Sequence, residues 1–158
     1  MQNEVIILVA DDDRGHLRLI EKNLERAGLR NRIEVFQDGE DLLAFLRGGD
    51  ATRLPHPNHA YLLLLDIHMP RLDGVEVLRE MKLDPQLRRI PVCMLSTTDD
   101  PREVDRCHAI GCSNYIVKPV DYEKFANAIR QLGLFLSLIQ VPELGCVQLG
   151  SSSPNASA

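Results

Sequence analysis

The chain has 158 residues, which is enough for one domain with a substantial hydrophobic core. Apolar residues make up 44% of it and charged residues 26%, as in ordinary globular proteins, and no apolar run approaches the roughly 20 residues that cross a membrane. The net charge of -5 and the scattered basic residues argue against a nucleic-acid-binding face, and the four cysteines show neither a CxxC pair nor a metal-ligand spacing.

The apolar patterning predicts five strands that alternate with five helices. In chain order these are strand 5–10, helix 15–27, strand 33–36, a helix after Asp38, strand 62–65, helix 75–82, strand 91–95, a helix from Asp100, strand 114–117 and helix 121–139. Asp13 is placed to cap the first helix and Gly28 to close it. The segment 48–59, which contains two Gly and two Pro, is predicted to be a loop insertion.

The strand at 62–65 is the centre of the predicted fold. Its run of four leucines is too short for an amphipathic helix and shows no alternation, which indicates a strand buried on both faces. Such strands belong to parallel sheets covered by helices. The alternating pattern therefore predicts a doubly wound α/β fold with a five-stranded parallel sheet and helices on both faces.

Polar residues follow four of the five predicted strands. They are Asp11 and Asp12 after the first strand, Asp66 after the third, Ser96 after the fourth and Lys118 after the fifth. The carboxyl ends of parallel strands meet at one edge of the sheet, where reactive groups collect in folds of this class. We therefore expect these five side chains to form one site.

Three carboxylates at one point cannot all remain ionised without a compensating charge. Mg²⁺ suits the set, because it takes oxygen ligands and combines one or two carboxylates with a phosphate oxygen. Lys118 would add a compact positive charge and Ser96 a hydroxyl donor. Together these groups can stabilise a phosphoryl group in transfer, with Asp66 as the nucleophile that becomes an aspartyl phosphate.

Each residue also has an ordinary explanation when it is taken alone. Asp13, like Asp11 or Asp12 by itself, is explained as a helix cap, Ser96 as a strand-end hydroxyl, and Lys118 as a solvated side chain. These separate explanations do not account for the occurrence of all these residues at the ends of neighbouring strands.

Four motifs resemble the receiver domain of two-component response regulators over residues 5–139. They are LVADD at 8–12, LLLDIHMPRLDG at 63–74, PVCMLS at 91–96 and NYIVKP at 114–119. The resemblance implies a flavodoxin-like sheet of strand order 2-1-3-4-5. It also implies a phosphoacceptor switch with slow self-dephosphorylation, and not an enzyme.

The resemblance assigns roles around the phosphoryl group. Asp66 would be the phosphoacceptor for a sensor histidine kinase, and Ser96 and Lys118 would contact the phosphoryl oxygens. Ser96 and Tyr115 would form the switch, with Tyr115 turning inward when the hydroxyl moves toward the phosphate. The Lys118–Pro119 bond is usually cis in the family.

The resemblance also implies a metal site for Mg²⁺. Asp12 and Asp66 would bind the ion directly, Asp11 would bind through water, and His68 would contribute its backbone carbonyl. Many relatives carry a smaller or different polar residue at the position of His68, so we expect this side chain to affect the lifetime of the aspartyl phosphate.

Three further features are similar to single-domain regulators that are paired with phytochrome-type histidine kinases, including bacteriophytochromes. They are the insertion at 48–59, the Ser-Thr-Thr run at 96–98, and a long last helix followed by an apolar-proline segment at 139–142. We therefore expect a cytoplasmic receiver domain over 1–142 and a disordered tail over 143–158. With no output domain following, it would signal by phosphorylation-dependent protein binding, with no nucleic-acid or membrane partner.

The last helix is also expected to join a homodimer. One stripe would pack against the sheet, and it consists of Phe125, Ile129, Leu132, Leu136 and Ile139. Leu134 and Leu138 project to the opposite side, where a surface helix normally carries polar residues. The alternative is that Gly133 ends the helix and the following residues form an irregular tail.

Two other functions remain open on the residues alone. A phosphohydrolase of the haloacid dehalogenase type uses an Asp-x-Asp after its first strand, which Asp11 and Asp13 formally supply. A flavodoxin-like cofactor carrier needs a phosphate-binding loop there, and three carboxylates would repel a phosphate.

Overall fold

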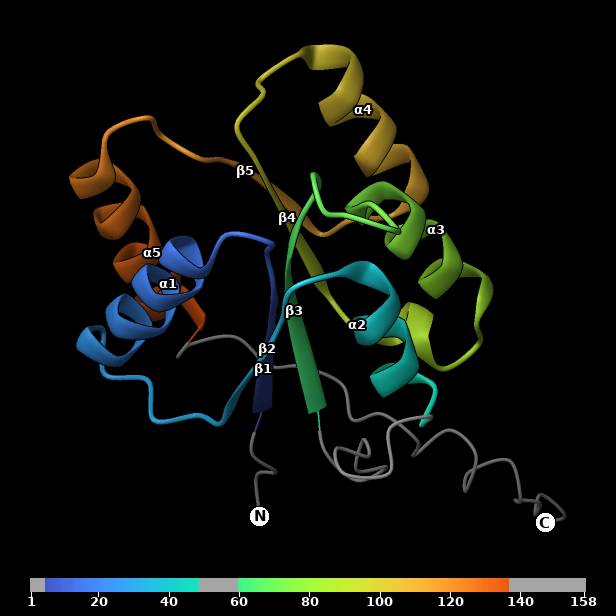
Figure 1. Cartoon of the computed structure of the whole chain (residues 1–158), viewed down its shortest axis with the longest axis horizontal. Coiled ribbons are helices and arrows are strands. Elements are labelled where there is room, and N and C mark those ends of the chain that lie inside the picture. Colours follow the sequence, from blue (N-terminus) through green and yellow to red (C-terminus); the bar gives the residue numbers. More distant parts are fainter. Residues whose placement is uncertain (1–4, 49–59, 137–158) are drawn as a thin grey trace, which may run out of the picture.

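The computed structural model describes residues 5–48 and 60–136, which form one parallel sheet with helices on either side (Figure 1). The strands are β1 (Val5–Ala10), β2 (Ile33–Phe36), β3 (Ala60–Asp66), β4 (Val92–Ser96) and β5 (Asn114–Val117). The helices are α1 (Arg14–Arg26), α2 (Gly39–Leu46), α3 (Gly74–Leu83), α4 (Pro101–Ile110) and α5 (Tyr122–Leu136), with a short 3-10 helix η1 (Leu87–Arg89). The strand order β2-β1-β3-β4-β5 confirms the predicted doubly wound, flavodoxin-like topology.

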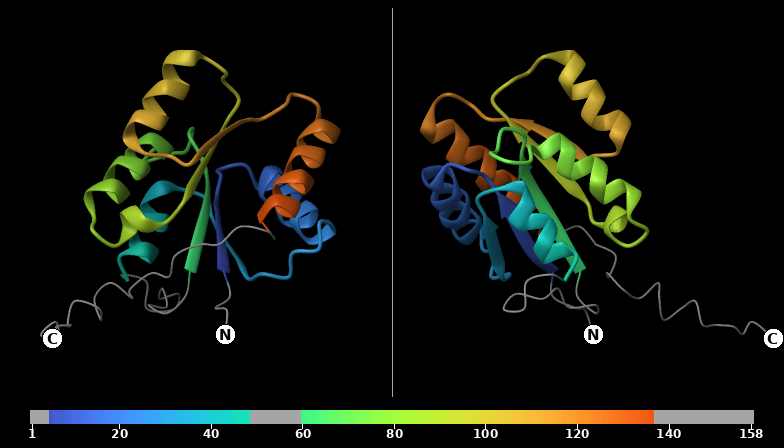
Figure 2. Two further views of the ribbon diagram at one scale, coloured as in Figure 1. Left: turned by 180° about the vertical axis from the view of Figure 1, so that it is seen from behind. Right: turned by 45° about the vertical axis from the view of Figure 1, so that its right-hand side comes forward.

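Helices bury both faces of the sheet. Helices α1 and α5 pack together on one face, and α2, α3 and α4 cover the other (Figure 2). In β1, Ile7 and Val9 pack beneath α1 and α5, whereas Ile6 and Leu8 pack beneath α2 and α3. This two-sided burial explains why β1 and β3 are apolar throughout. Since β3 pairs with β1 and β4, Asp66 lies at the end of the central strand.

Each of the five α-helices begins after an aspartate whose side chain accepts a backbone N–H of the first turn. These caps are Asp13 for α1, Asp38 for α2, Asp73 for α3, Asp100 for α4 and Asp121 for α5. The caps at Asp13, Asp38 and Asp100 confirm the helix starts predicted from the sequence. The β4 strand extends to Ser96, one residue beyond its predicted end.

Helix α5 continues through Gly133, which decides between the two alternatives for this segment. A Cβ atom at Gly133 would lie 2.8 Å from the Cβ of Ala27, at the end of α1. Gly133 therefore permits close packing of two helices and does not terminate the second one. Residues 137–158 and 49–59 lie outside the described residues, and with them Leu138, Ile139, the predicted tail and most of the predicted insertion.

No helix within the described ranges is long and apolar enough to cross a membrane.

Candidate functional site

The polar residues predicted at the strand ends lie together at the carboxyl edge of the sheet. Asp66 is the last residue of β3, Ser96 is the last residue of β4, and Lys118 follows β5 directly. The carboxylate oxygens of Asp11, Asp12 and Asp66 come within 4.8 Å of one another. The parallel topology alone accounts for this meeting, because each of these residues leaves the sheet at the same edge.

Lys118 supplies the positive charge of the cluster. Its Nζ lies 2.5 Å from Oδ2 of Asp11 and 3.2 Å from Oδ1 of Asp66. Lys118 and Asp11 are buried, so water screens this pair weakly, whereas Asp12 is exposed. The Lys118–Pro119 bond is trans, because the described residues contain no cis peptide bond, and the cis geometry expected from the resemblance is not observed.

The Asp66 carboxylate is held in an unfavourable environment for a charge. Burial and then the neighbouring Asp11 raise its pKa to about 6, and Lys118 opposes both effects. A raised carboxyl pKa beside two other carboxylates indicates that the cluster has more negative charge than Lys118 compensates. Such a site favours a cation, and it remains largely ionised and nucleophilic at neutral pH.

Ser96 and Tyr115 are linked through one residue of the loop that follows β4. The Ser96 hydroxyl oxygen accepts a hydrogen bond from the backbone N–H of Thr98 at 3.1 Å. The Tyr115 hydroxyl donates to the backbone carbonyl of Thr98 at 3.0 Å. Any movement of the Ser96 hydroxyl therefore acts on the loop segment to which Tyr115 is bonded.

The exposed side chain of His68 lies beside a groove of about 360 Å³ between the loop after β3 and the start of α4. Arg102 and Arg106 line the groove from α4, and Asp73 lines it from the cap of α3. His68 follows Asp66 by two residues, so this groove adjoins the carboxylate cluster.

His16 was not identified from the sequence, although it contacts the cluster. Its Nδ1 lies 3.2 Å from Nζ of Lys118 and 3.5 Å from Oδ2 of Asp11, and its ring meets Phe125 edge to face at 5.4 Å between centroids. The available signal was its position three residues after the Asp13 cap, which places it on the first turn of α1. Which face of that turn meets the site depends on the packing of α1 against α5, which the local sequence does not encode.

Gly74, the last residue of the motif at 63–74, packs closely against the backbone of Asp66. A Cβ atom at Gly74 would lie 2.3 Å from the Asp66 carbonyl oxygen. The Gly74 amide also donates to the Ile67 carbonyl at 2.7 Å. The missing side chain thus lets α3 begin directly against the end of β3.

A carboxylate cluster with a buried lysine, at the carboxyl edge of a 2-1-3-4-5 parallel sheet, defines the class of phosphoacceptor receivers. The chain belongs to the response regulator receiver domain family, whose model matches residues 7–130. Proteins of this family are phosphoacceptor switches of two-component phosphorelays and not enzymes in the ordinary sense.

Three similar proteins show where the chain falls within this family. A response regulator receiver domain from Rhodospirillum rubrum shares 50% identity, with a TM-score of 0.82, over 88% of this chain and 98% of that one. Response regulator Rcp1 from Synechocystis is 33% identical over 87% of this chain and 92% of its own, and its Mn²⁺-bound structure superposes with a TM-score of 0.78. The phosphorylated cyanobacterial phytochrome response regulator RcpA is 31% identical, with a TM-score of 0.78, over 89% of this chain and 99% of that one.

Proposed function

We propose that this chain is a single-domain response regulator that accepts a phosphoryl group from a histidine kinase on Asp66 and signals by phosphorylation-dependent protein binding. One observation carries the proposal. The carboxylate of Asp66 is buried at the end of the central strand, with Nζ of Lys118 3.2 Å from its Oδ1 and two further carboxylates beside it. The alignment with Rcp1 covers 92% of that response regulator, which supports a regulator that consists of one receiver domain.

In the proposed reaction a carboxylate oxygen of Asp66 attacks the phosphorus of the kinase's phosphohistidine. An O–P bond forms as the N–P bond breaks, and the electron pair remains on the imidazole nitrogen, which takes a proton from solvent. Lys118 is placed to move from Asp11 toward the arriving phosphoryl oxygens, and the Ser96 hydroxyl would donate to another of them. These contacts stabilise charge that the phosphoryl group brings into a buried site.

The residues at this edge fit a hard divalent cation, and we propose Mg²⁺. Asp12 and Asp66 would hold it directly, Asp11 through water, and His68 through its carbonyl. When bound, the ion would neutralise the clustered carboxylates and the phosphoryl charge. The raised pKa of Asp66 supports the proposal, as does the Mn²⁺-bound form of Rcp1.

Ser96 and Tyr115 are the proposed switch. In the structure the two side chains are joined through Thr98, which gives a route by which a hydroxyl drawn toward a phosphoryl oxygen would displace Tyr115. The surface around β5 and α4 would then change its fit for a partner protein.

We further propose that the kinase is of the phytochrome type and that the protein forms a homodimer through α5. The likeness to RcpA, a phytochrome response regulator, supports the first part. The second part is supported by Leu134 and Phe135, which expose 57% and 53% of their surface on a helix whose opposite side, at Phe125 and Ile129, is buried.

A phosphohydrolase of the haloacid dehalogenase type is not favoured by the geometry. Asp13, which would complete its Asp-x-Asp pair, accepts the backbone N–H groups of Gly15 and His16 as the cap of α1. The chain's membership of the receiver family points the same way.

The test of the proposed function is phosphorylation with a small phosphodonor and Mg²⁺, followed by intact-mass measurement. We expect one phosphoryl adduct on the parent protein and none on Asp66→Asn. Asp105→Asn, a matched change at an exposed position of α4, should be labelled like the parent. A full adduct on Asp66→Asn would show that another residue is the acceptor.

A further inference from the structure

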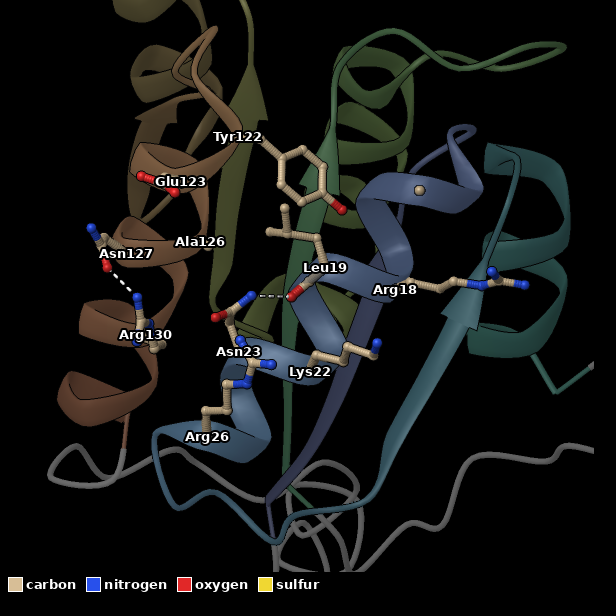
Figure 3. Close-up of a pocket in the computed structure, with 11 residues that line it drawn as sticks. Arg18, Leu19, Lys22, Asn23, Arg26, Tyr122, Glu123, Ala126, Asn127 and Arg130 are labelled. Atoms are coloured by element: carbon tan, nitrogen blue, oxygen red, sulfur yellow. Dashed lines mark hydrogen bonds between the residues drawn. The ribbon is translucent and has the colours of Figure 1, made fainter.

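A second concave site lies between α1 and α5, and it shares no residue with the carboxylate cluster (Figure 3). Its volume is about 620 Å³, which is the size of a small-molecule site. Its lining includes Arg18, Lys22, Asn23 and Arg26 from α1, and Tyr122 and Arg130 from α5.

The charge of this groove is opposite to that of the molecule. Four cationic side chains line it against one carboxylate, that of Glu123, although the whole chain has a net charge of -5. Within the described ranges, Arg18, Lys22 and Arg26 form no ion pair with a carboxylate. Figure 3 shows Arg26 and Arg130 on either side of the groove, while Arg18 and Lys22 extend from α1 away from α5. The groove therefore has two cations positioned for contact and two that raise the local potential.

Asn23 is an independent sign that the groove takes a ligand. Its side chain is buried, with 3% of its surface exposed, and its Nδ2 donates to the Leu19 carbonyl at 2.8 Å. Its Oδ1 has no hydrogen-bond partner among the described residues, and in Figure 3 this oxygen lies on the side toward α5. A buried acceptor without a donor costs about 1–3 kcal/mol, so a ligand whose donor reached this oxygen would regain that free energy on binding.

Tyr122 adds an aromatic face at the upper end of the groove in Figure 3, where 61% of its surface is exposed. Exposed aromatic rings of this kind stack readily with planar bases. The three features thus follow one another along the groove: an aromatic ring, a buried hydrogen-bond acceptor, and a pair of guanidinium groups.

We propose that the groove between α1 and α5 binds a purine nucleotide that carries two or more phosphates. The base stacks on Tyr122 and donates a hydrogen bond from its exocyclic amine to Oδ1 of Asn23. The phosphates lie between Arg26 and Arg130, whose planar guanidinium groups bind phosphate oxygens in pairs.

The test is calorimetric titration of the whole chain with ATP, GTP and inorganic pyrophosphate. EDTA is present throughout, so that no metal ion can tether phosphates to Asp11, Asp12 and Asp66. We expect a nucleotide to bind more tightly than pyrophosphate. Replacing both guanidinium groups, in Arg26→Gln/Arg130→Gln, should weaken nucleotide and pyrophosphate binding by about tenfold or more. The matched loss of two exposed charges in Arg88→Gln/Lys124→Gln should change neither by more than about twofold.

The Asn23→Leu variant separates base recognition from charge. We expect it to weaken nucleotide binding by about fivefold or more while pyrophosphate binding is unchanged, with phosphorylation of Asp66 as the check that the protein is folded. Three results would overturn the proposal: no binding of either nucleotide at about 1 mM, pyrophosphate binding as tight as nucleotide binding, or parent-like affinity in the Arg26→Gln/Arg130→Gln protein. The last variant alters only exposed side chains, so it remains informative even if Asn23→Leu fails to fold.

Discussion

Asp66 carries its charge where water can do little to stabilise it. Its pKa is raised to about 6 by burial and by Asp11, whereas an aspartate in an unfolded chain titrates near 4. Between about pH 4 and pH 6 the folded protein therefore holds a proton that the unfolded chain releases. The free energy of unfolding therefore falls as pH rises through this window, because the buried carboxyl group of Asp66 becomes charged. Above about pH 6 the whole of this loss remains.

Asp66→Asn should accordingly stabilise the metal-free protein at neutral pH. We expect a gain of about 2 kcal/mol in the free energy of unfolding at pH 7.5, which shrinks toward zero below about pH 4. Urea denaturation in EDTA, at pH 7.5 and below about pH 4, measures this gain in the free energy of unfolding. Asp105→Asn is the control and should show no such gain. A loss of stability at pH 7.5 would contradict the assigned cause of the raised pKa.

In the proposed reaction Lys118 contacts the phosphoryl group and offsets its charge. Lys118→Ala should slow phosphorylation of Asp66 by about a hundredfold, because among the described residues no other lysine or arginine forms an ion pair with Asp66. Lys124→Ala, an exposed lysine on α5, should label at the parent rate. Chelation of Mg²⁺ in the parent should also abolish labelling, and labelling that persists in EDTA would exclude the proposed metal.

The residues of the site divide into those that the sequence can place and those that it cannot. The sequence can place Asp11, Asp66, Ser96 and Lys118, because each lies at or directly after the end of a strand and parallel strands end at one edge of the sheet. His16 lies on a helix, so its approach to Lys118 depends on the packing of α1 against α5.

At the level of elements, the loop between β3 and α3 is held by close backbone contacts. Arg71 has a left-handed backbone with a φ of 65°, and its guanidinium bonds to Asp38 at the cap of α2 and lies 3.3 Å from Glu40. A Cβ atom at Gly39 would lie 2.3 Å from the Leu72 carbonyl oxygen. The start of α2 and the loop after Asp66 therefore pack as one unit.

Gly74→Ala should disturb this unit. The new Cβ would lie 2.3 Å from the Asp66 carbonyl oxygen, so the backbone at Asp66 must shift. We expect a loss of about 1–3 kcal/mol in the free energy of unfolding, together with slower phosphorylation. Gly15→Ala, whose Cβ would meet only the Asp13 carboxylate at 3.1 Å, is the control and should change stability by less than about 1 kcal/mol. Equal stability of the two variants would show that the loop tolerates the shift.

Most elements were predictable because their signals are local. The run of leucines in β3 and the caps at Asp13 and Asp100 are properties of a few neighbouring residues. The sequence did not decide whether α5 ends at Gly133. The helix continues there because Gly133 packs against Ala27, a residue far away in the sequence. The 3-10 helix η1 was also missed, since a single turn leaves no periodic pattern.

At the level of the whole molecule, the proposed dimer depends on the end of α5. We expect the parent protein to be dimeric by light scattering at about 50 μM, and Leu134→Lys/Phe135→Lys to be monomeric, because each new charge would be buried at the two-fold contact. Leu83→Lys changes a leucine that is 76% exposed at the end of α3, and it should leave the dimer intact. A monomeric parent, or a dimer unaffected by the double substitution, would remove α5 as the interface.

Lys118 and Asp11 form an ion pair although they lie far apart in the sequence. The lysine is therefore synthesised much later than the aspartate. These residues are 107 positions apart, and β5 pairs only with β4 at the edge of the sheet. A nascent chain that has emerged as far as α4 presents three carboxylates without the lysine that balances them. If Asp66 accepts the phosphoryl group as proposed, we expect its transfer to be slow until translation has passed β5, so that a kinase would modify completed chains in preference to incomplete ones.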